Sequence, residues 1–317
     1  MRLDLYVDYS DHASQIAAFL ATNAADVHGV DLHLHNVSRD AVRAWHGGYG
    51  PGDAPDSPAA RWRALDLVRT AERFGVVLST REPEPAEPPD DAIFDVPTFV
   101  IDGGPPIYGV DRWPLVQARL APACAYVPPV RAGAVEVFHD VASPYSYLGV
   151  SALIASGADV TFTPILLGAL FRALGTPDVP VAAMSEARRA WVLRDLHDWA
   201  AFRRLPFRYR TRFPIRSVTA QRVTILEPRA IGPLYNAAWA DDRPISEPAD
   251  VAAVLDGAGL PGGDLVARSG DARDALRANT ERAQNLGVFG VPTYRVGGAL
   301  FWGQDHLEAA LLASQSP

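Results

Sequence analysis

Apolar and polar positions along the chain predict strands and helices in an order that occurs twice. The first half predicts a strand at 3–7, a helix at about 12–24, a strand at 30–37 and a helix at 59–74. The second half predicts a strand at 135–139, a helix from 144, a strand at 160–163, two strands at 293–296 and 299–302, and a final helix from 305. The sequence therefore predicts two halves of similar construction.

A second repeat places the same motif near the end of each half. F-D-V-P-T-F at 94–99 matches F-G-V-P-T-Y at 289–294, and each is followed by a glycine turn and a Gly-x-Asp sequence, at 109–111 and 303–305. The period exceeds a hundred residues. A period of this length indicates two related domains rather than a solenoid of short repeats.

The length of 317 residues agrees with about two domains. We expect a first domain at 1–120, a proline-containing linker at 121–133 and a second domain at 134–317. Residues from about 167 to 283 are mostly helical in pattern and are interrupted by prolines. The predicted fold class is α/β, with two tandem thioredoxin-like domains of which the second carries a large helical insertion.

Composition narrows the classes of function. The chain has 48% apolar and 21% charged residues and a net charge of −8, which argues against nucleic acid as a partner. No apolar run is long enough to span a bilayer, and the chain starts directly with a strand pattern, so we expect a cytoplasmic protein without a membrane partner. Cys124 is the only cysteine. It excludes an internal disulfide and the Cys-x-x-Cys motif of a disulfide oxidoreductase.

Four blocks of the second half carry a family resemblance. They are H-D-V-A-S-P-Y-S-Y-L-G at 139–149, P-I-L-L-G-A-L-F at 164–171, a central block from 193 to 217 that ends in F-P-I-R-S, and N-L-G-V-F-G-V-P-T-Y at 285–294 leading to F-W-G-Q-D-H-L. In these blocks the chain resembles the 2-hydroxychromene-2-carboxylate isomerases and kappa-class glutathione transferases. The resemblance implies a DsbA-like thioredoxin fold with a helical insertion and glutathione as the thiol cofactor.

Ser143 is the predicted catalytic residue. It stands where a redox-active thioredoxin carries its first cysteine, and Pro144 follows it at the predicted start of a helix. A hydroxyl at a helix N-terminus can donate to a bound thiolate, and the helix dipole favours the negative charge. The alternative interpretation is that Ser143 only caps the helix. Because the protein lacks a suitable cysteine, a thiol that acts here has to be supplied by glutathione or another small thiol.

The resemblance also implies binding residues for glutathione. The Val291 backbone pairs with the peptide as an added strand next to Pro292, which is cis in this fold, and Gln304 and Asp305 hold its glutamyl end. Asp305 is equally suited to capping the last helix. Arg188 stands where family members have a lysine, and a guanidinium also binds carboxylates.

The predicted substrate site is aromatic and cationic. Arg216 stands where the family has asparagine, and it is bulkier and charged. The side chains predicted to form an aromatic wall for a flat substrate are Tyr145, Phe171, Trp191 and Trp302, although aromatic residues at such spacings are more often core. His33 and His35 share a strand face without the ligand pattern of a metal site, so we expect no metal.

The leading hypothesis is a glutathione-dependent cis–trans isomerase of a 2-hydroxychromene-2-carboxylate-like aromatic acid. A kappa-like glutathione transferase and a non-catalytic thioredoxin-like binding protein are the alternatives. In the first half Asp11 occupies the serine position, where a carboxylate repels a thiolate, so we expect a degenerate, inactive repeat. From this interpretation we expect either a homodimer or a monomer in which the first half takes the place of a dimer partner.

Overall fold

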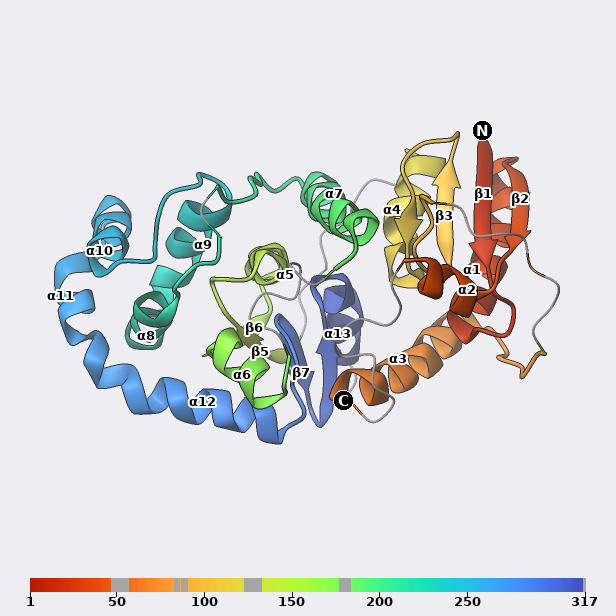
Figure 1. Cartoon of the computed structure of the whole chain (residues 1–317). Helices are drawn as coiled ribbons and strands as arrows, with labels where there is room; N and C mark the ends of the chain where they lie inside the picture. The colour runs from red at the N-terminus through yellow and green to blue at the C-terminus, as the bar shows by residue number, and fades with distance from the viewer. Residues whose placement is uncertain are drawn as a thin grey trace. The chain divides into compact units, whose positions relative to one another are not determined.

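The computed structural model describes residues 1–46, 57–82, 86, 91–122, 133–176, 184–211 and 213–315. Contacts divide the chain into two units, Met1–Tyr126 with Pro180–Asp198, and Val127–Val179 with Trp199–Pro317. Each unit contains one four-stranded sheet (Figure 1). Cys124 and most of the predicted linker lie outside the described residues.

The helices and strands follow the predicted order. The first unit comprises β1 (Arg2–Val7), α1 (His12–His28), β2 (Asp31–Asn36), α2 (Arg39–Trp45), α3 (Pro58–Phe74), β3 (Thr98–Ile101), β4 (Ile107–Tyr108), the 3-10 helix η1 (Val110–Arg112), α4 (Trp113–Leu120) and most of α7 (Glu186–Phe202). The second unit begins with β5 (Ala134–His139), α5 (Pro144–Ser156), β6 (Asp159–Pro164) and α6 (Leu167–Ala173). It continues with α8 (Val218–Leu226), η3 (Pro228–Ala230), α9 (Ile231–Trp239), α10 (Pro248–Gly257), α11 (Gly262–Ala267), η4 (Arg268–Ala272) and α12 (Arg273–Asn285). It ends with β7 (Thr293–Val296), β8 (Ala299–Trp302), η5 (Gln304–His306) and α13 (Leu307–Ala313).

The two sheets have the same topology. Their strand orders are β2-β1-β3-β4 and β6-β5-β7-β8, and in each the first pair is parallel and the other two pairs are antiparallel. The register is also equivalent, because Thr98 lies opposite Tyr108 in one sheet and Thr293 opposite Trp302 in the other. This is the arrangement of the predicted tandem thioredoxin-like domains.

Local sequence signals account for the first helix of each unit. Asp11 caps α1 by accepting from the Ser14 amide at 2.9 Å, and Ser143 caps α5 by accepting from the Ser146 amide at 3.2 Å. Both helices end at a glycine in the left-handed conformation, with φ of 64° and 69°. The caps fix where each helix begins, and they place its first residue directly after the central strand.

Each unit has its own apolar core. In the first unit Leu3 and Leu5 of β1 are fully buried against Ile16 of α1. In the second unit Val137 of β5 is fully buried, as are Leu148 and Leu153 of α5. Burial of such side chains contributes roughly 1.5–3 kcal/mol each. A large apolar helix surface therefore holds α5, and with it Ser143, against the sheet.

Two features depart from the sequence prediction. Helix α2 covers residues 39–45, a segment of the first half for which no helix was predicted. It begins after Ser38, whose side chain accepts from the Ala41 amide. Helix α7 falls within the predicted insertion of the second domain, yet residues 180–198 have their contacts in the first unit. Only the end of α7, from Trp199, belongs to the second unit.

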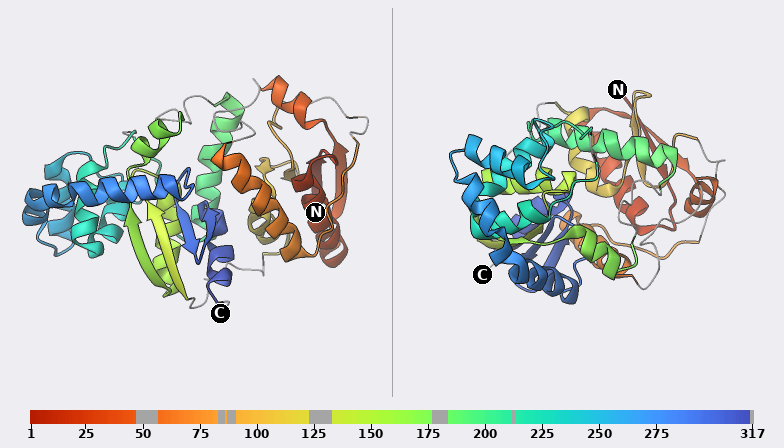
Figure 2. Two further views of the ribbon diagram at one scale, coloured as in Figure 1. Left: turned by 90° about the horizontal axis from the view of Figure 1, so that it is seen from below. Right: turned by 60° about the vertical axis from the view of Figure 1, so that its left-hand side comes forward.

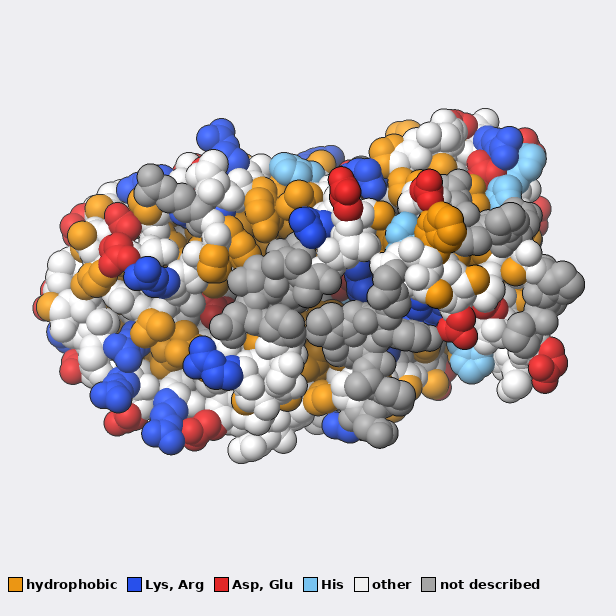
Figure 3. Space-filling view, in the orientation of Figure 1, with side chains coloured by type: hydrophobic (Ala, Val, Ile, Leu, Met, Phe, Trp, Pro, Cys, Tyr) orange, Lys and Arg blue, Asp and Glu red, His pale blue; other side chains and the backbone are white. Residues whose placement is uncertain are grey.

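The remaining insertion helices surround one side of the second sheet. Helices α8–α11 gather beyond β6, and α12 runs alongside the sheet, where it contacts β6 and α6 (Figures 1 and 2). Acidic and arginine side chains are interspersed on the face of these helices seen in Figure 3, with ion pairs such as Arg277–Glu281 at 2.8 Å. No helix within the described ranges combines the length and apolar character needed to cross a membrane.

Candidate active site

Ser143 lies between the N-terminus of α5 and the loop that contains Pro292. Its Oγ accepts from the Ser146 amide and donates to the Val291 carbonyl oxygen at 3.4 Å. The side chain is nearly buried, at 4% exposure. Residues 148 positions apart are thus joined by one hydroxyl, as the sequence prediction of a shared site requires.

The loops at Pro97 and Pro292 are built alike. Both prolines follow a cis peptide bond, as the resemblance implied for Pro292. Thr293 Oγ1 donates to the Gly290 carbonyl at 2.7 Å, and the Gly303 amide donates to the Pro292 carbonyl at 2.9 Å. These contacts hold the Val291 backbone beside Ser143.

Asp140 stabilises the turn that precedes Ser143. Its carboxylate accepts from the amides of Ala142 at 2.9 Å and Leu167 at 2.8 Å, and its carbonyl accepts from the Ser143 amide at 3.0 Å. Burial raises the pKa of Asp140 to about 6 because the ionised carboxylate is removed from water. Sequence reasoning missed this residue, although its repetition at Asp8 was a usable signal.

Beneath the turn lies a buried polar pair. His139 Nδ1 is 3.1 Å from the Tyr235 hydroxyl of α9, and its Nε2 has no hydrogen-bond partner among the described residues. Burial lowers the pKa of His139 to about 3, so the imidazole is neutral at physiological pH. His139 therefore contributes no positive charge that would stabilise a thiolate.

Side chains of the insertion contact the same turn. Gln221 of α8 donates to the carbonyls of His139 and Ile165, both at 2.8 Å, and accepts from the Val141 amide at 3.3 Å. Trp239 of α9 donates from its indole N–H to the Val141 carbonyl at 2.8 Å. Neither residue was predicted, since nothing in the local sequence shows which distant backbone groups a helix contacts.

Gln304 and Asp305, predicted to hold glutathione, lie in the 3-10 turn before α13. Gln304 is 1% exposed, and neither atom of its side-chain amide has a hydrogen-bond partner in the described part of the chain. Asp305 contacts His306 Nδ1 at 3.0 Å. The structural role expected for Asp305 was wrong: the capping residues here are Gly303 and His306, and neither makes a side-chain capping bond.

Gly303 explains the repeated Gly-x-Asp sequence. Its φ of 99° is in the region that favours glycine, and a Cβ there would lie 2.2 Å from Asp305 Oδ1. Gly109 has the same conformation, with φ of 98°, and a Cβ there would lie 2.4 Å from Asp111 Oδ1. The motif is a turn that both units share, so by itself it identifies the fold and not an activity.

The four aromatic residues predicted to form a substrate wall have different environments. Trp302 packs on Phe289 with ring centroids 4.7 Å apart, and Tyr145 and Phe171 are half-buried in the second unit. Trp191 is a buried residue of the first unit. Its ring contacts Phe94, Tyr108 and the guanidinium of Arg112, which identifies it as a core residue there.

The two predicted arginines belong to different units. Arg188 belongs to the first unit. There burial raises the pKa of Tyr108, and the positive charge of Arg188 acts in the opposite direction. Arg216 belongs to the second unit, but its side chain is 81% exposed and pairs with Glu247 at 3.4 Å. An exposed pair of this kind is weakly held, so Arg216 is a surface residue in this conformation.

The position equivalent to Ser143 in the first unit is filled by ion pairs. Asp11 contacts Arg39 Nη1 at 2.5 Å, and Arg39 also reaches Asp95, which Arg43 binds at 2.7 Å. Although burial opposes ionisation, the two guanidinium groups hold the pKa of Asp95 below its usual range. The Asp11 carboxylate, which was predicted to repel a thiolate, is thus paired with a guanidinium group.

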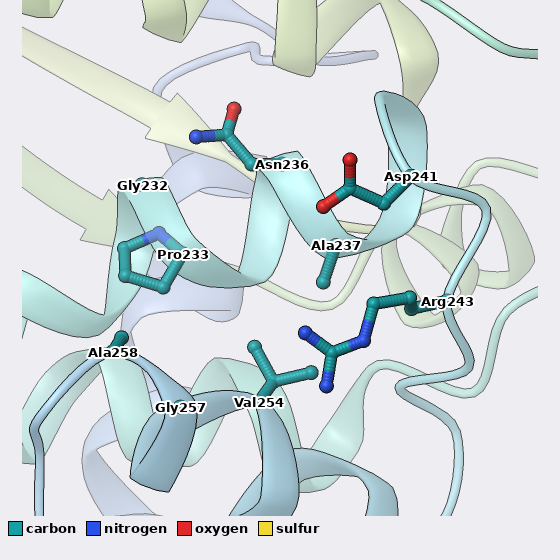
Figure 4. Close-up of a pocket in the computed structure, with 9 residues that line it drawn as sticks. All are labelled: Gly232, Pro233, Asn236, Ala237, Asp241, Arg243, Val254, Gly257 and Ala258. Carbon is teal, nitrogen blue, oxygen red and sulfur yellow. The ribbon is translucent and has the colours of Figure 1, made fainter.

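A pocket of about 320 Å³ opens between α9 and α10 (Figure 4). Ala237 of α9 and Val254 of α10 point toward each other, and the Arg243 side chain extends between the two helices. Asn236 and Asp241 also line the pocket. Neither Ser143 nor any predicted ligand residue lines it. No cluster of three or more potential metal-ligating side chains occurs among residues whose placement is described.

Comparison with known proteins agrees with the topology of the second unit. The DSBA-like thioredoxin domain family matches residues 134–313. The chain belongs to this family.

A solved structure shares this fold. A 2-hydroxychromene-2-carboxylate isomerase matches at 22% identity and a TM-score of 0.50, over 55% of this chain and 90% of its own. A probable DsbA oxidoreductase from Streptomyces coelicolor matches at 22% identity and a TM-score of 0.46, over 58% of this chain and 92% of its own. The cytosolic disulfide reductase DsbM from Pseudomonas aeruginosa, solved with glutathione, matches at 18% identity and a TM-score of 0.39. This match covers 57% of this chain and 95% of its own. No curated protein matches the chain.

Proposed function

We propose that the second unit binds a small thiol, glutathione in the first instance, and uses it to isomerise a double bond in a flat aromatic carboxylic acid. The observation that carries the proposal is the 3.4 Å contact between Ser143 Oγ and the Val291 carbonyl at the N-terminus of α5. It joins a hydroxyl donor, a helix dipole and an extended backbone segment at one point. The sequence at this turn contains no cysteine of its own.

The residues at this point fit a thiolate. The hydroxyl proton of Ser143 can turn from the Val291 carbonyl to a sulfur placed before the helix, and the dipole of α5 favours negative charge there. In nearly buried surroundings such a hydrogen bond is stronger than in water. Val291, Pro292, Gln304 and Asp305 belong to the same unit as Ser143, whereas Arg188 does not.

When bound, the thiol supplies a nucleophile that adds to a conjugated carbon, making the double bond single while its electrons rest on the conjugated carbonyl, and then leaves so that both thiol and alkene are restored. The chain contributes the Ser143 donor and the groups that hold the turn. We place Trp302, Tyr145 and Phe171 against the aromatic ring of the substrate. The reaction is redox-neutral and consumes no thiol.

A kappa-like glutathione transferase is the second candidate. The exposed ion pair of Arg216 with Glu247 favours it, because a carboxylate clamp is the feature that the isomerase needs and the transferase does not. The two reactions share the same thiolate site. They differ in whether the sulfur adduct is released.

Calorimetric titration of glutathione into the purified protein tests the common step. We expect saturable binding together with ultraviolet absorbance of a bound thiolate at neutral pH, and absence of both would contradict the proposal. Product analysis with an aromatic enone acid then separates the candidates. An isomerase leaves the glutathione concentration unchanged, whereas a transferase consumes one equivalent for each product.

A further inference from the structure

The helical insertion of the second unit contacts the backbone of the turn that carries Ser143. Within residues 139–143 the His139 carbonyl, the Val141 amide and the Val141 carbonyl all bond to insertion side chains. Gln221 makes the first two contacts and Trp239 makes the third. Both side chains are fully buried, so water does not compete for these bonds.

The first unit provides an internal comparison. There the Asp11 amide donates to the Asp8 carbonyl at 2.9 Å, just as the Ser143 amide donates to Asp140. The Tyr9 carbonyl, equivalent to that of Val141, accepts from Gln15 at 2.9 Å, and Gln15 also bonds to Ser79. The turn therefore forms without an insertion, supported by a glutamine of its own first helix.

The second unit supports its turn differently. Tyr147 stands at the position of Gln15, and its hydroxyl donates to the Pro206 carbonyl instead of to the turn. In the unit that carries Ser143, side chains of α8 and α9 therefore make the hydrogen bonds that support the turn. Both helices lie in the segment that the first unit lacks.

We propose that Gln221 and Trp239 are positioning residues that hold Ser143 in the orientation needed to stabilise a bound thiolate, and that this is one role of the insertion. The inference rests on the proposed function, since it assigns the two residues to the same Ser143 site. Gln221 links the turn to both parallel strands, because it bonds to the carbonyl of His139 at the end of β5 and to that of Ile165 just after β6. Trp239 holds the carbonyl of Val141, which lies between Asp140 and Ala142.

The decisive variant is Gln221→Met, which keeps the side-chain volume and removes all three bonds. We expect the Val141 amide to exchange with deuterium about tenfold faster, while amides in the middle of α5 keep their rates. The pKa of the bound glutathione thiol should rise toward its free value. Turnover at neutral pH should fall about tenfold with little change in the KM for glutathione, and most of the loss should disappear at alkaline pH, where thiolate forms without help.

Gln15→Met is the matched control, because it removes the equivalent support from the first unit. It should loosen the turn at Tyr9 and leave the thiol pKa and the pH profile of turnover unchanged. Trp239→Phe covers the case in which Gln221→Met does not fold. It removes a single N–H while keeping a ring, and it should shift the thiol pKa in the same direction by a smaller amount.

The outcomes separate this inference from the proposed function. If the wild-type protein binds no thiol, the proposed function fails, and with it the assignment of Gln221 to thiolate chemistry. If thiol binds but Gln221→Met leaves the thiol pKa or the Val141 exchange rate unchanged, the proposed function stands and the positioning role is wrong. A loss of turnover that is equal at all pH values also overturns the positioning role.

Discussion

Asp8 and Asp140 make the same two backbone hydrogen bonds at equivalent points of the two sheets. Each accepts from the amide two residues ahead, both at 2.9 Å. Each also accepts from the first amide of the helix that follows the neighbouring parallel strand, at 2.9 Å for Arg39 of α2 and 2.8 Å for Leu167 of α6. The two residues differ in burial: Asp140 is 1% exposed, whereas Asp8 is half-buried. The repeat therefore extends to individual bonds, while the environment of the carboxylate has diverged.

The burial of Asp140 predicts a pH-dependent stability. Its pKa is raised from 3.8 to about 6, so between these values the folded protein holds a proton that the unfolded chain has lost. The contribution of this carboxyl to the free energy of unfolding therefore falls as the pH rises from about 4 through 6. Relative to wild type, Asp140→Asn should gain up to about 3 kcal/mol across this window. Urea denaturation of both proteins at a series of pH values measures the difference, and a constant difference would contradict the assignment.

Ser143→Ala should reduce turnover by at least about tenfold, because removing a positioned donor to a developing or bound anion costs a few kcal/mol. The loss of the helix cap should lower stability by only about 1 kcal/mol. Ser57→Ala is the control, since Ser57 caps α3 with an equivalent bond to Ala60 at 3.1 Å. Steady-state kinetics and thermal denaturation of both variants separate the two effects; equal kinetics for Ser143→Ala and wild type would remove Ser143 from the chemistry.

Asp305→Ala should weaken glutathione binding, whereas Asp111→Ala should not. The two aspartates occupy equivalent 3-10 turns, but only Asp305 belongs to the unit that carries Ser143. Asp111 is paired instead with Arg112 at 2.6 Å. Calorimetry with glutathione gives the two dissociation constants. Similar weakening by both changes would mean that the thiol site has been assigned to the wrong half.

Gly303→Ala should destabilise the protein by roughly 1–3 kcal/mol, since alanine is strained at φ of 99°. The added methyl group would also meet the Asp305 carboxylate. Gly298→Ala is the comparison, because a Cβ at that position meets no atom within 4 Å. Chemical denaturation of both variants reports the difference, and a Gly303→Ala protein as stable as Gly298→Ala would show that the turn relaxes easily.

The repeat in the sequence predicted the parts of the fold that depend on local signals. The paired strands, the cap at Ser143 and the cis bond before Pro292 all follow from short motifs that occur in both halves or in related proteins. Helix α2 was missed because its seven residues are too few to give a clear helical period.

The contacts that sequence reasoning missed are long-range. Gln221 and Trp239 meet the Ser143 turn from residues 80 or more positions away, and their own sequence surroundings look like those of any buried helix. The place of Arg216 at the substrate was inferred from a family position and stays a prediction. In the structure its side chain is exposed and pairs with Glu247.

Helix α7 changes how the chain can be divided. Trp191 is covered by Phe94, Tyr108 and Arg112, and the carboxylate of Asp195 forms a two-point ion pair with Arg112, all within the first unit. A cut at the apparent boundary near residue 130 would separate these partners, exposing an indole and leaving Asp195 without its guanidinium partner. The first unit is therefore discontinuous in sequence. A truncated second half would expose the apolar and charged face of α7 that packs in the first unit of the intact chain.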